Sequence, residues 1–186
     1  HDLCVSASGE YFIVMEYVNG KDLSDVIRAA QLAGREIPPE IAVYICREVA
    51  KGLYYAHNQT DSAGANLNII HRDISPQNVL ISYDGEVKIV DFGIAKASQR
   101  SKETESGVIK GKFFYMSPEQ VRGMPLDRRS DVFSVGVVLF ETLTGTRLFQ
   151  AETDFATLEK VRAVEVPRPT SLNPDIPKPL ENIIFK

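Results

Sequence analysis

The sequence has 186 residues, of which 44% are hydrophobic and 25% charged, as in an ordinary globular domain with a sizeable core. A net charge of −4 and the lack of any basic block argue against a nucleic-acid partner. The longest nearly apolar stretch, 132–140, is too short to span a bilayer. Cys4 and Cys46 are too few for a disulfide framework or a zinc site, so we expect small buried apolar residues in a reducing, cytoplasmic setting.

The first part of the chain predicts a strand followed by two helices. The β-branched and aromatic run 11–17 predicts a strand, which the Asn-Gly pair at 19–20 ends. Apolar residues at helical spacing predict a helix over 22–32. Two prolines at 38–39 predict the start of a second helix. Its predicted apolar face comprises Ile41, Tyr44, Ile45, Val49, Leu53 and Ala56.

The middle of the chain predicts two loops separated by a hairpin. Residues 58–68 are polar and contain glycine, which indicates a loop. Short apolar runs at 78–82 and 86–90 flank an Asp-Gly pair, which is a strong hairpin signal. Residues 97–112 are rich in Ser, Lys and Glu without periodicity, and a loop of this length inside a domain is usually functional.

The last part of the chain predicts two helices and a connector. Residues 128–144 predict a long helix that is buried on most sides, and 153–164 predict an amphipathic helix. The five prolines in 166–179 predict an extended connector, after which a helical apolar pattern begins. Both ends of the sequence are abrupt, so we expect these residues to be part of a longer protein.

Three short motifs follow one another: His-Arg-Asp-Ile-Ser-Pro-Gln-Asn at 71–78, Asp-Phe-Gly at 91–93 and Ser-Pro-Glu at 117–119. With a predicted hairpin between the first two and a Ser-rich loop between the last two, the chain resembles the protein kinase family over essentially its whole length. The resemblance implies an α+β, protein-kinase-like fold. Residues 1–186 would form a partial catalytic domain, comprising the hinge strand, a short β-hairpin and a mainly helical C-terminal lobe, with the activation segment at 91–119.

The resemblance also implies roles for four polar side chains. Phosphoryl transfer needs an acceptor hydroxyl in line with the γ-phosphate of ATP, and cations that neutralise the developing charge. Asp73 matches the carboxylate that orients this hydroxyl and takes its proton. Asn78 and Asp91 match the oxygen ligands of Mg²⁺. Asp131 matches the helix aspartate that holds the catalytic loop through backbone N–H groups. ATP, Mg²⁺ and a protein substrate are the expected partners, and His71 is expected to pack behind the loop.

Residues 11–22 resemble the kinase hinge, which binds the adenine of ATP. Met15 matches the residue behind the adenine pocket, and Glu16 and Val18 match positions whose backbone groups bond the adenine edge. Asp22 matches the position that often contacts the ribose. A plain buried strand that ends in a turn is the alternative.

Arg72, beside Asp73, suggests control by phosphorylation. Kinases with this pair are often activated when a phosphate on the activation loop neutralises and anchors the arginine. The candidate phosphorylation sites are Ser98, Ser101, Thr104 and Ser106. For any single one of them, a solvated loop residue without this role is the favoured interpretation.

The sequence also departs from the kinase pattern. No Gly-rich loop or Val-Ala-x-Lys strand precedes the hinge, so we expect the ATP-covering N-terminal lobe to be missing from these residues and the chain alone to be inactive. Ser75 and Lys112 stand where serine kinases usually have Lys and Thr, and Lys112 could supply the charge that Ser75 lacks. Glu119 matches a glutamate whose arginine partner lies beyond Lys186, so we expect it to lack that partner.

The substrate class follows from the same residues. Because Ser75 and Lys112 replace the usual Lys and Thr, the chain lacks two markers of serine/threonine specificity. Tyrosine kinases lack the same markers. However, residues 115–119 lack the tryptophan typical of tyrosine kinases. The motifs and the loop at 59–68 look most like those of bacterial serine/threonine kinases, in which a membrane segment often lies outside the kinase domain. The alternative is a pseudokinase that binds partners as a scaffold, against which the presence of Asp73, Asn78 and Asp91 argues.

Overall fold

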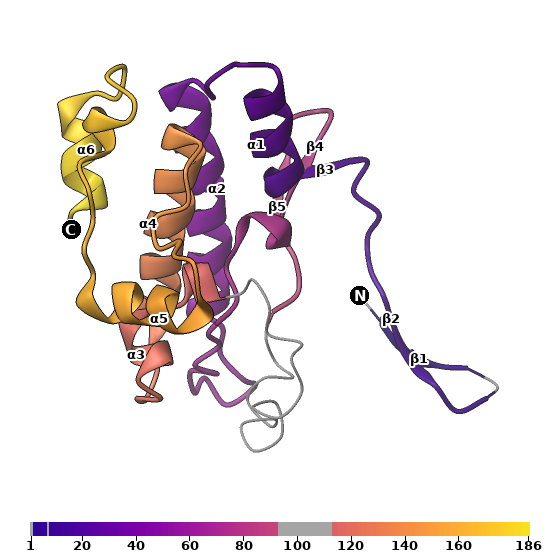
Figure 1. Ribbon diagram of the computed structural model, residues 1–186. Coiled ribbons are helices and arrows are strands. Elements are labelled where there is room, and N and C mark those ends of the chain that lie inside the picture. The colour runs from indigo at the N-terminus through magenta and orange to yellow at the C-terminus, as the bar shows by residue number, and fades with distance from the viewer. Residues whose placement is uncertain (1, 7, 93–112) are drawn as a thin grey trace.

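The computed structural model describes residues 2–6, 8–92 and 113–186. Figure 1 shows the helices gathered into one body, from which a two-stranded ribbon near the N-terminus stands apart. None of the helices in this part of the chain is long and apolar enough to cross a lipid bilayer.

The strands form two small antiparallel sheets. β1 (Asp2–Val5) pairs with β2 (Tyr11–Val14) in the ribbon. β3 (Gly20–Asp22), β4 (Val79–Ser82) and β5 (Val87–Ile89) form the other sheet, with β4 in the middle. The predicted hairpin is therefore confirmed.

The hinge strand is shorter than predicted. We expected a strand over 11–17, but β2 ends at Val14 and pairs with β1, and β3 takes the position beside β4. Gly20 explains why β3 can do so: a Cβ atom there would lie 1.9 Å from the carbonyl oxygen of Ile81, so only glycine permits this close approach.

Two helices follow β3. α1 (Leu23–Leu32) begins at Asp22, whose carboxylate accepts a hydrogen bond from the Asp25 N–H at 2.8 Å. α2 (Pro39–His57) buries Ala42, Ile45, Cys46, Val49, Leu53 and Ala56. Ile41 and Tyr44 are exposed, contrary to the predicted apolar face, because the buried stripe is centred one residue further along the helix. Cys46 is buried, which raises its pKa to about 12, whereas Cys4 is only half-buried.

The predicted central helix is confirmed as α4 (Arg128–Thr144). Asp127 caps its first turn, and Gly145 ends it in the left-handed conformation that glycine tolerates best. α4 packs on α2, and both helices contribute to the apolar core. Ile74 and Val79 also lie in this core, so the segment between them is anchored at both ends.

Shorter elements complete the chain. They are the 3₁₀ turns η1 (Pro76–Asn78), η3 (Phe113–Tyr115) and η4 (Pro169–Ser171), and the helices α3 (Pro118–Val121), α5 (Asp154–Ala163) and α6 (Lys178–Ile184). α5 confirms the helix predicted at 153–164. The predicted connector 166–179 is less extended than expected, since it contains η4 and the first residues of α6.

Candidate active site

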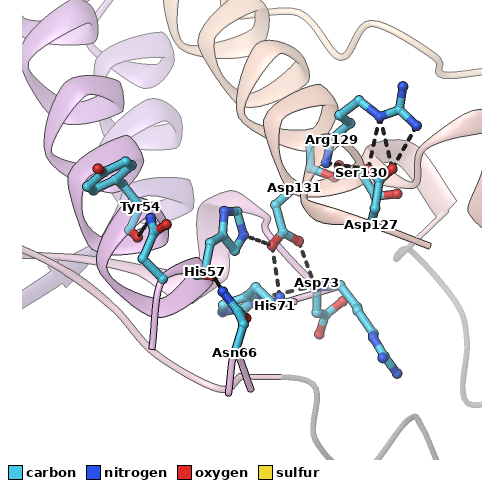
Figure 2. A network of polar contacts seen from close by, with 12 residues as sticks. Tyr54, His57, Asn66, His71, Asp73, Asp127, Arg129, Ser130 and Asp131 are labelled. Atoms are coloured by element: carbon cyan, nitrogen blue, oxygen red, sulfur yellow. Dashed lines mark hydrogen bonds and ion pairs between the residues drawn. The ribbon is translucent and has the colours of Figure 1, made fainter. Parts of the chain in front are cut away.

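Asp131, in the first turn of α4, is the centre of a buried polar network (Figure 2). Its carboxylate accepts the backbone N–H of His71 at 2.9 Å and the backbone N–H of Arg72 at 2.8 Å. A carboxylate buried to 1% exposure needs such donors, because an unpaired buried charge is strongly unfavourable. α4 therefore fixes the first residues of the segment 71–78, in the manner expected for Asp131.

His57, in the last turn of α2, is a third donor to this carboxylate. Its Nε2 lies 2.7 Å from Oδ2 of Asp131, and an ionised carboxylate can only accept, so the imidazole donates. Sequence analysis assigned no role to His57. The sequence indicated only that a histidine ends an otherwise apolar helix face. It gave no indication that this histidine contacts Asp131.

His71 is fully buried and joins two of the sequence motifs. Its Nε2 lies 3.1 Å from the carbonyl oxygen of Val90, and its Nδ1 lies 3.3 Å from the backbone nitrogen of Asp73. Nδ1 can accept that N–H only if Nε2 carries the ring proton, which defines the neutral tautomer. Burial lowers the pKa of His71 and favours the same neutral form. Its ring centroid lies 4.5 Å from that of Phe92.

Asp73 and Asn78 lie in direct contact. The Asn78 side-chain amide donates to the backbone oxygen of Asp73 at 2.7 Å and to its carboxylate at 3.3 Å. These bonds use the Asn78 N–H groups and leave its Oδ1 as an acceptor. The Val90 N–H donates to the Asn78 carbonyl at 3.0 Å, which places Asp91, the next residue, at the same end of the hairpin.

Two residues of this region have strained backbones. Arg72 and Asp91 have φ values of 66° and 60°, in the left-handed region that costs a non-glycine residue about 1–2 kcal/mol. Such strain persists only where surrounding contacts impose it, and it is frequent at functional sites.

The Ser-Pro-Glu motif packs beside the same segment through α3. Ser117 caps α3, and the side chain of Gln120 closes a capping box by accepting the Ser117 N–H at 2.8 Å. The Gln120 amide then donates to the carbonyl oxygen of Arg72 at 2.8 Å. Sequence analysis missed this contact, although the Ser-x-x-Gln spacing is itself a capping-box signal.

Glu119 has a partner other than the expected arginine. Its carboxylate accepts the Ser130 hydroxyl at 2.6 Å, a contact that sequence analysis did not predict. Ser75 is buried, and its carbonyl accepts the Asn78 N–H at 3.0 Å. Nε of Arg72 is buried and has no hydrogen-bond partner among the described residues.

A second buried polar cluster joins η3 to α4. The Tyr115 hydroxyl donates to Glu141 at 2.5 Å, and Arg147 lies 3.8 Å from the same carboxylate. Burial raises the pKa of both Tyr115 and Glu141. The guanidinium of Arg147 also lies 4.5 Å from the ring centre of Phe114. Sequence analysis did not predict this cluster.

The expected hinge residues lie apart from these networks. Met15 is 52% exposed, and Val18 is half-buried. Glu16 forms an ion pair with Lys88 of β5, and Asp22 caps α1. The structure thus brings Arg72, Asp73, Asn78 and Asp131 together through hydrogen bonds in which, among the described residues, Met15 and Val18 take no part.

Five expected site residues lie outside the described residues. They are Lys112 and the candidate phosphorylation sites Ser98, Ser101, Thr104 and Ser106.

An apolar cavity of about 540 Å³ adjoins Phe92. It lies between α2 and β5 and is lined mainly by Gly52, Tyr55, Ala56, Val87, Ile89 and Phe92. Phe92 therefore lines this apolar cavity and also contacts the ring of His71.

Among models of known families, that of the protein kinase domain matches residues 3–184. The chain belongs to the protein kinase family. It is a kinase of the Hanks type, similar to bacterial serine/threonine kinases.

Three curated relatives illustrate the similarity. The chain is 46% identical over 180 residues to "Tyrosine-protein kinase MasK" of Myxococcus xanthus, which covers 97% of this chain and 28% of that protein. It is 38% identical over 187 residues to "Probable serine/threonine-protein kinase PknB" of Lactococcus lactis, and the match covers 98% of this chain and 28% of that protein. It is 37% identical over 176 residues to "Serine/threonine-protein kinase PrkC" of Bacillus subtilis, and the match covers 95% of this chain and 25% of that protein. The chain thus spans about a quarter of the length of each relative.

Proposed function

We propose that the whole protein transfers the γ-phosphoryl group of ATP to serine or threonine hydroxyls of a protein substrate, and that this chain supplies its hinge and C-terminal lobe. The observation that carries the proposal is the contact between Asn78 and Asp73 on a loop that Asp131 holds at His71 and Arg72. A catalytic carboxylate must be held close to its productive position, and the hydrogen bonds of this network would restrain Asp73 in this way.

The chemistry of the donors fits one magnesium site. Oδ1 of Asn78 and the exposed carboxylate of Asp91 are hard oxygen donors at the same end of the hairpin. Mg²⁺ is usually bound by one or two protein groups together with substrate phosphates, so two such donors are enough. The bound ion would supply positive charge against the phosphates.

The roles of the remaining residues follow the chemistry of transfer. Asp73 would orient the acceptor hydroxyl and take its proton. The backbone groups of Glu16 and Val18 would bind the adenine edge, with Met15 behind the adenine and Asp22 near the ribose. Because these 186 residues include no Gly-rich loop, we expect the isolated chain to be inactive and the whole protein to need a small lobe that covers ATP. We also expect this domain to work in the cytoplasm, where ATP is available.

The serine/threonine preference rests on the names of two relatives and on the motif pattern. PknB and PrkC are named serine/threonine kinases, whereas MasK is named a tyrosine kinase. Ser75 and Lys112 fit neither class fully, and our hypothesis is that Lys112 supplies the positive charge near the transferred phosphate. Reversing the charge at Lys112 in the whole protein without loss of activity would refute it.

Arg72 supports control by phosphorylation. Its buried Nε, which has no partner in the described part of the chain, is a charged donor that would gain from a phosphate oxygen. We propose that phosphorylation of Ser98, Ser101, Thr104 or Ser106 provides this oxygen. Replacing all four by alanine should abolish any activation by autophosphorylation, and unchanged activation would contradict the proposal.

The test of the proposed function uses the whole protein with radiolabelled ATP, Mg²⁺ and a generic protein substrate, followed by phosphoamino-acid analysis. We expect phosphoserine or phosphothreonine in the wild type, and none with Asp91→Asn. Asp84→Asn, at the exposed tip of the same hairpin, is the matched control and should stay active. Phosphotyrosine alone would overturn the substrate class. ATP-independent binding of partners with no transfer would favour a pseudokinase scaffold.

A further inference from the structure

The peptide unit between Arg72 and Asp73 is held by a side chain at each end. Its carbonyl oxygen, on Arg72, accepts the Gln120 amide N–H at 2.8 Å. Its N–H, on Asp73, faces Nδ1 of His71 at 3.3 Å. Because this peptide unit leads directly to the Cα atom of Asp73, its orientation determines where the Asp73 carboxylate can point.

The backbone at Arg72 does not adopt this conformation by preference. Its φ of 66° is unfavourable for a residue with a Cβ atom, so outside contacts must impose it. Asp131, on α4, accepts the N–H of Arg72 at 2.8 Å. Gln120, on α3, donates to the carbonyl oxygen of Arg72. The strained residue is thus restrained from both sides by two different helices.

The Gln120 side chain is itself fixed. Its Oε1 accepts the Ser117 N–H at 2.8 Å, and the Ser117 hydroxyl accepts the Gln120 N–H at 3.3 Å. Ser117 offers a donor and Arg72 offers an acceptor, so only one orientation of the amide satisfies both. Gln120 therefore connects the end of the Ser-Pro-Glu motif to the loop that carries Asp73.

We infer that Gln120 is a positioning residue, which holds the Arg72 carbonyl and thereby sets the orientation of Asp73. The effect of this orientation on catalysis rests on the proposed function, in which Asp73 acts on the acceptor hydroxyl. The role is specific to the side-chain amide, because the capping box needs only its oxygen, whereas the bond to Arg72 needs its N–H.

The substitution Gln120→Glu separates the two bonds in the whole protein. Glutamate at this position still closes a capping box with Ser117, but it cannot donate to Arg72. We expect kcat to fall about tenfold or more while KM for ATP stays within about twofold, because ATP binding does not use this bond. We also expect amide hydrogen exchange in the peptide covering 71–78 to accelerate about fivefold, while α4 stays protected.

The matched control is Gln31→Glu. The Gln31 amide donates to the carbonyl oxygen of Gly145 at the end of α4, so the substitution removes the same kind of bond far from the loop. It should leave both kcat and exchange in 71–78 unchanged. Gln120→Leu, which adds no charge, should lower kcat at least as far as Gln120→Glu and also lower the melting temperature.

The outcomes separate this inference from the proposed function. Wild-type exchange rates in 71–78 for Gln120→Glu would overturn the positioning role, whether or not the protein transfers phosphate. Faster exchange with an unchanged kcat in an active protein would also overturn it. A wild-type protein without phosphoryl transfer would instead refute the proposed function, and the exchange rates would still decide whether Gln120 holds the loop.

Discussion

The first turn of α4 and the β1–β2 ribbon differ in which side chains they bury: the first buries a charged group, and the second exposes apolar groups. At the base of α4, the charged side chain of Asp131 is buried and receives three hydrogen bonds, from His57, His71 and Arg72. In the ribbon, Tyr11 and Ile13 are 75% and 64% exposed. Figure 1 shows the ribbon standing away from the helices.

This difference in burial predicts which segments contribute to the stability of the folded state and which do not. A buried carboxylate with a full set of donors is costly to disrupt, because each donor left behind is unpaired. Exposed apolar side chains on a two-stranded ribbon contribute little to the folded state. Four substitutions or changes of condition test this contrast, in order of expected effect.

The largest effect is expected for Asp131→Ala. It leaves two backbone N–H groups and the His57 ring without their acceptor, so we expect the free energy of unfolding to fall by about 3–5 kcal/mol. Asp127→Ala, four residues earlier on the surface, removes a helix cap and an exposed ion pair with Arg129, and it should have a much smaller effect. Urea denaturation followed by circular dichroism measures both. Equal losses would show that burial of the Asp131 network is not what matters.

Tyr115→Phe should have the next largest effect. It removes the hydroxyl that donates to the buried Glu141, so we expect a loss of about 1–3 kcal/mol in the free energy of unfolding. Tyr44→Phe removes an exposed bond to the Gly85 carbonyl and serves as the control, with a smaller loss. Thermal melts of the two variants under identical conditions give the comparison, which fails if Tyr44→Phe is the more damaging.

The pH dependence of stability should reflect His71. Its pKa is lowered from the ordinary value of 6.5, so below pH 6.5 the unfolded state binds a proton that the folded state does not. Stability should therefore fall as the pH drops through 6.5, by at most about 1.4 kcal/mol per pH unit from this group. His71→Leu should be less stable at pH 8 but should change less on acidification to pH 5.5. An equally steep pH dependence in this variant would contradict the assignment.

The smallest effect on stability is expected in the ribbon. Ile13→Thr keeps a β-branched residue in an exposed strand, so the free energy of unfolding should change by no more than about 0.5 kcal/mol. Ile74→Thr makes the same exchange in the core, where it should cost several times more. Light scattering should show less self-association for Ile13→Thr than for the wild type. A large loss of stability would mean that the ribbon packs against something in solution.

Local signals in the sequence predicted the parts of the fold that neighbouring residues determine. Helix α4 was predicted at its observed bounds from its long apolar composition. The hairpin followed from Asp-Gly between two apolar runs. The three-residue strand β3 was missed because Gly, Lys and Asp have low strand propensity, and only the close approach at Gly20 decides its pairing.

The sequence motifs predicted which residues form the candidate site, but they did not predict the contacts that support these residues. In the structure Asn78 contacts Asp73, and Asp131, which lies outside the three motifs, binds the loop at His71 and Arg72. The catalytic and metal-binding roles of Asp73 and Asn78 stay predictions. The contacts of His57 with Asp131, Gln120 with Arg72 and Tyr115 with Glu141 join residues 74, 48 and 26 positions apart. Such pairs depend on how distant segments pack, and a single sequence carries no local signal for them.

The β4–β5 hairpin has one further consequence, for insertion of foreign segments. At its base, the Val90 N–H bonds to the Asn78 carbonyl and Val79 pairs with Ile89, which fixes the spacing between Asn78 and Asp91. At its tip, Gly85 has a φ of 88° and open space around its Cα atom. Because the register is set at the base, the tip should accept a short epitope or a fluorophore-binding peptide. Such a tag would report on this kinase from a position that leaves the two metal-ligand candidates in register.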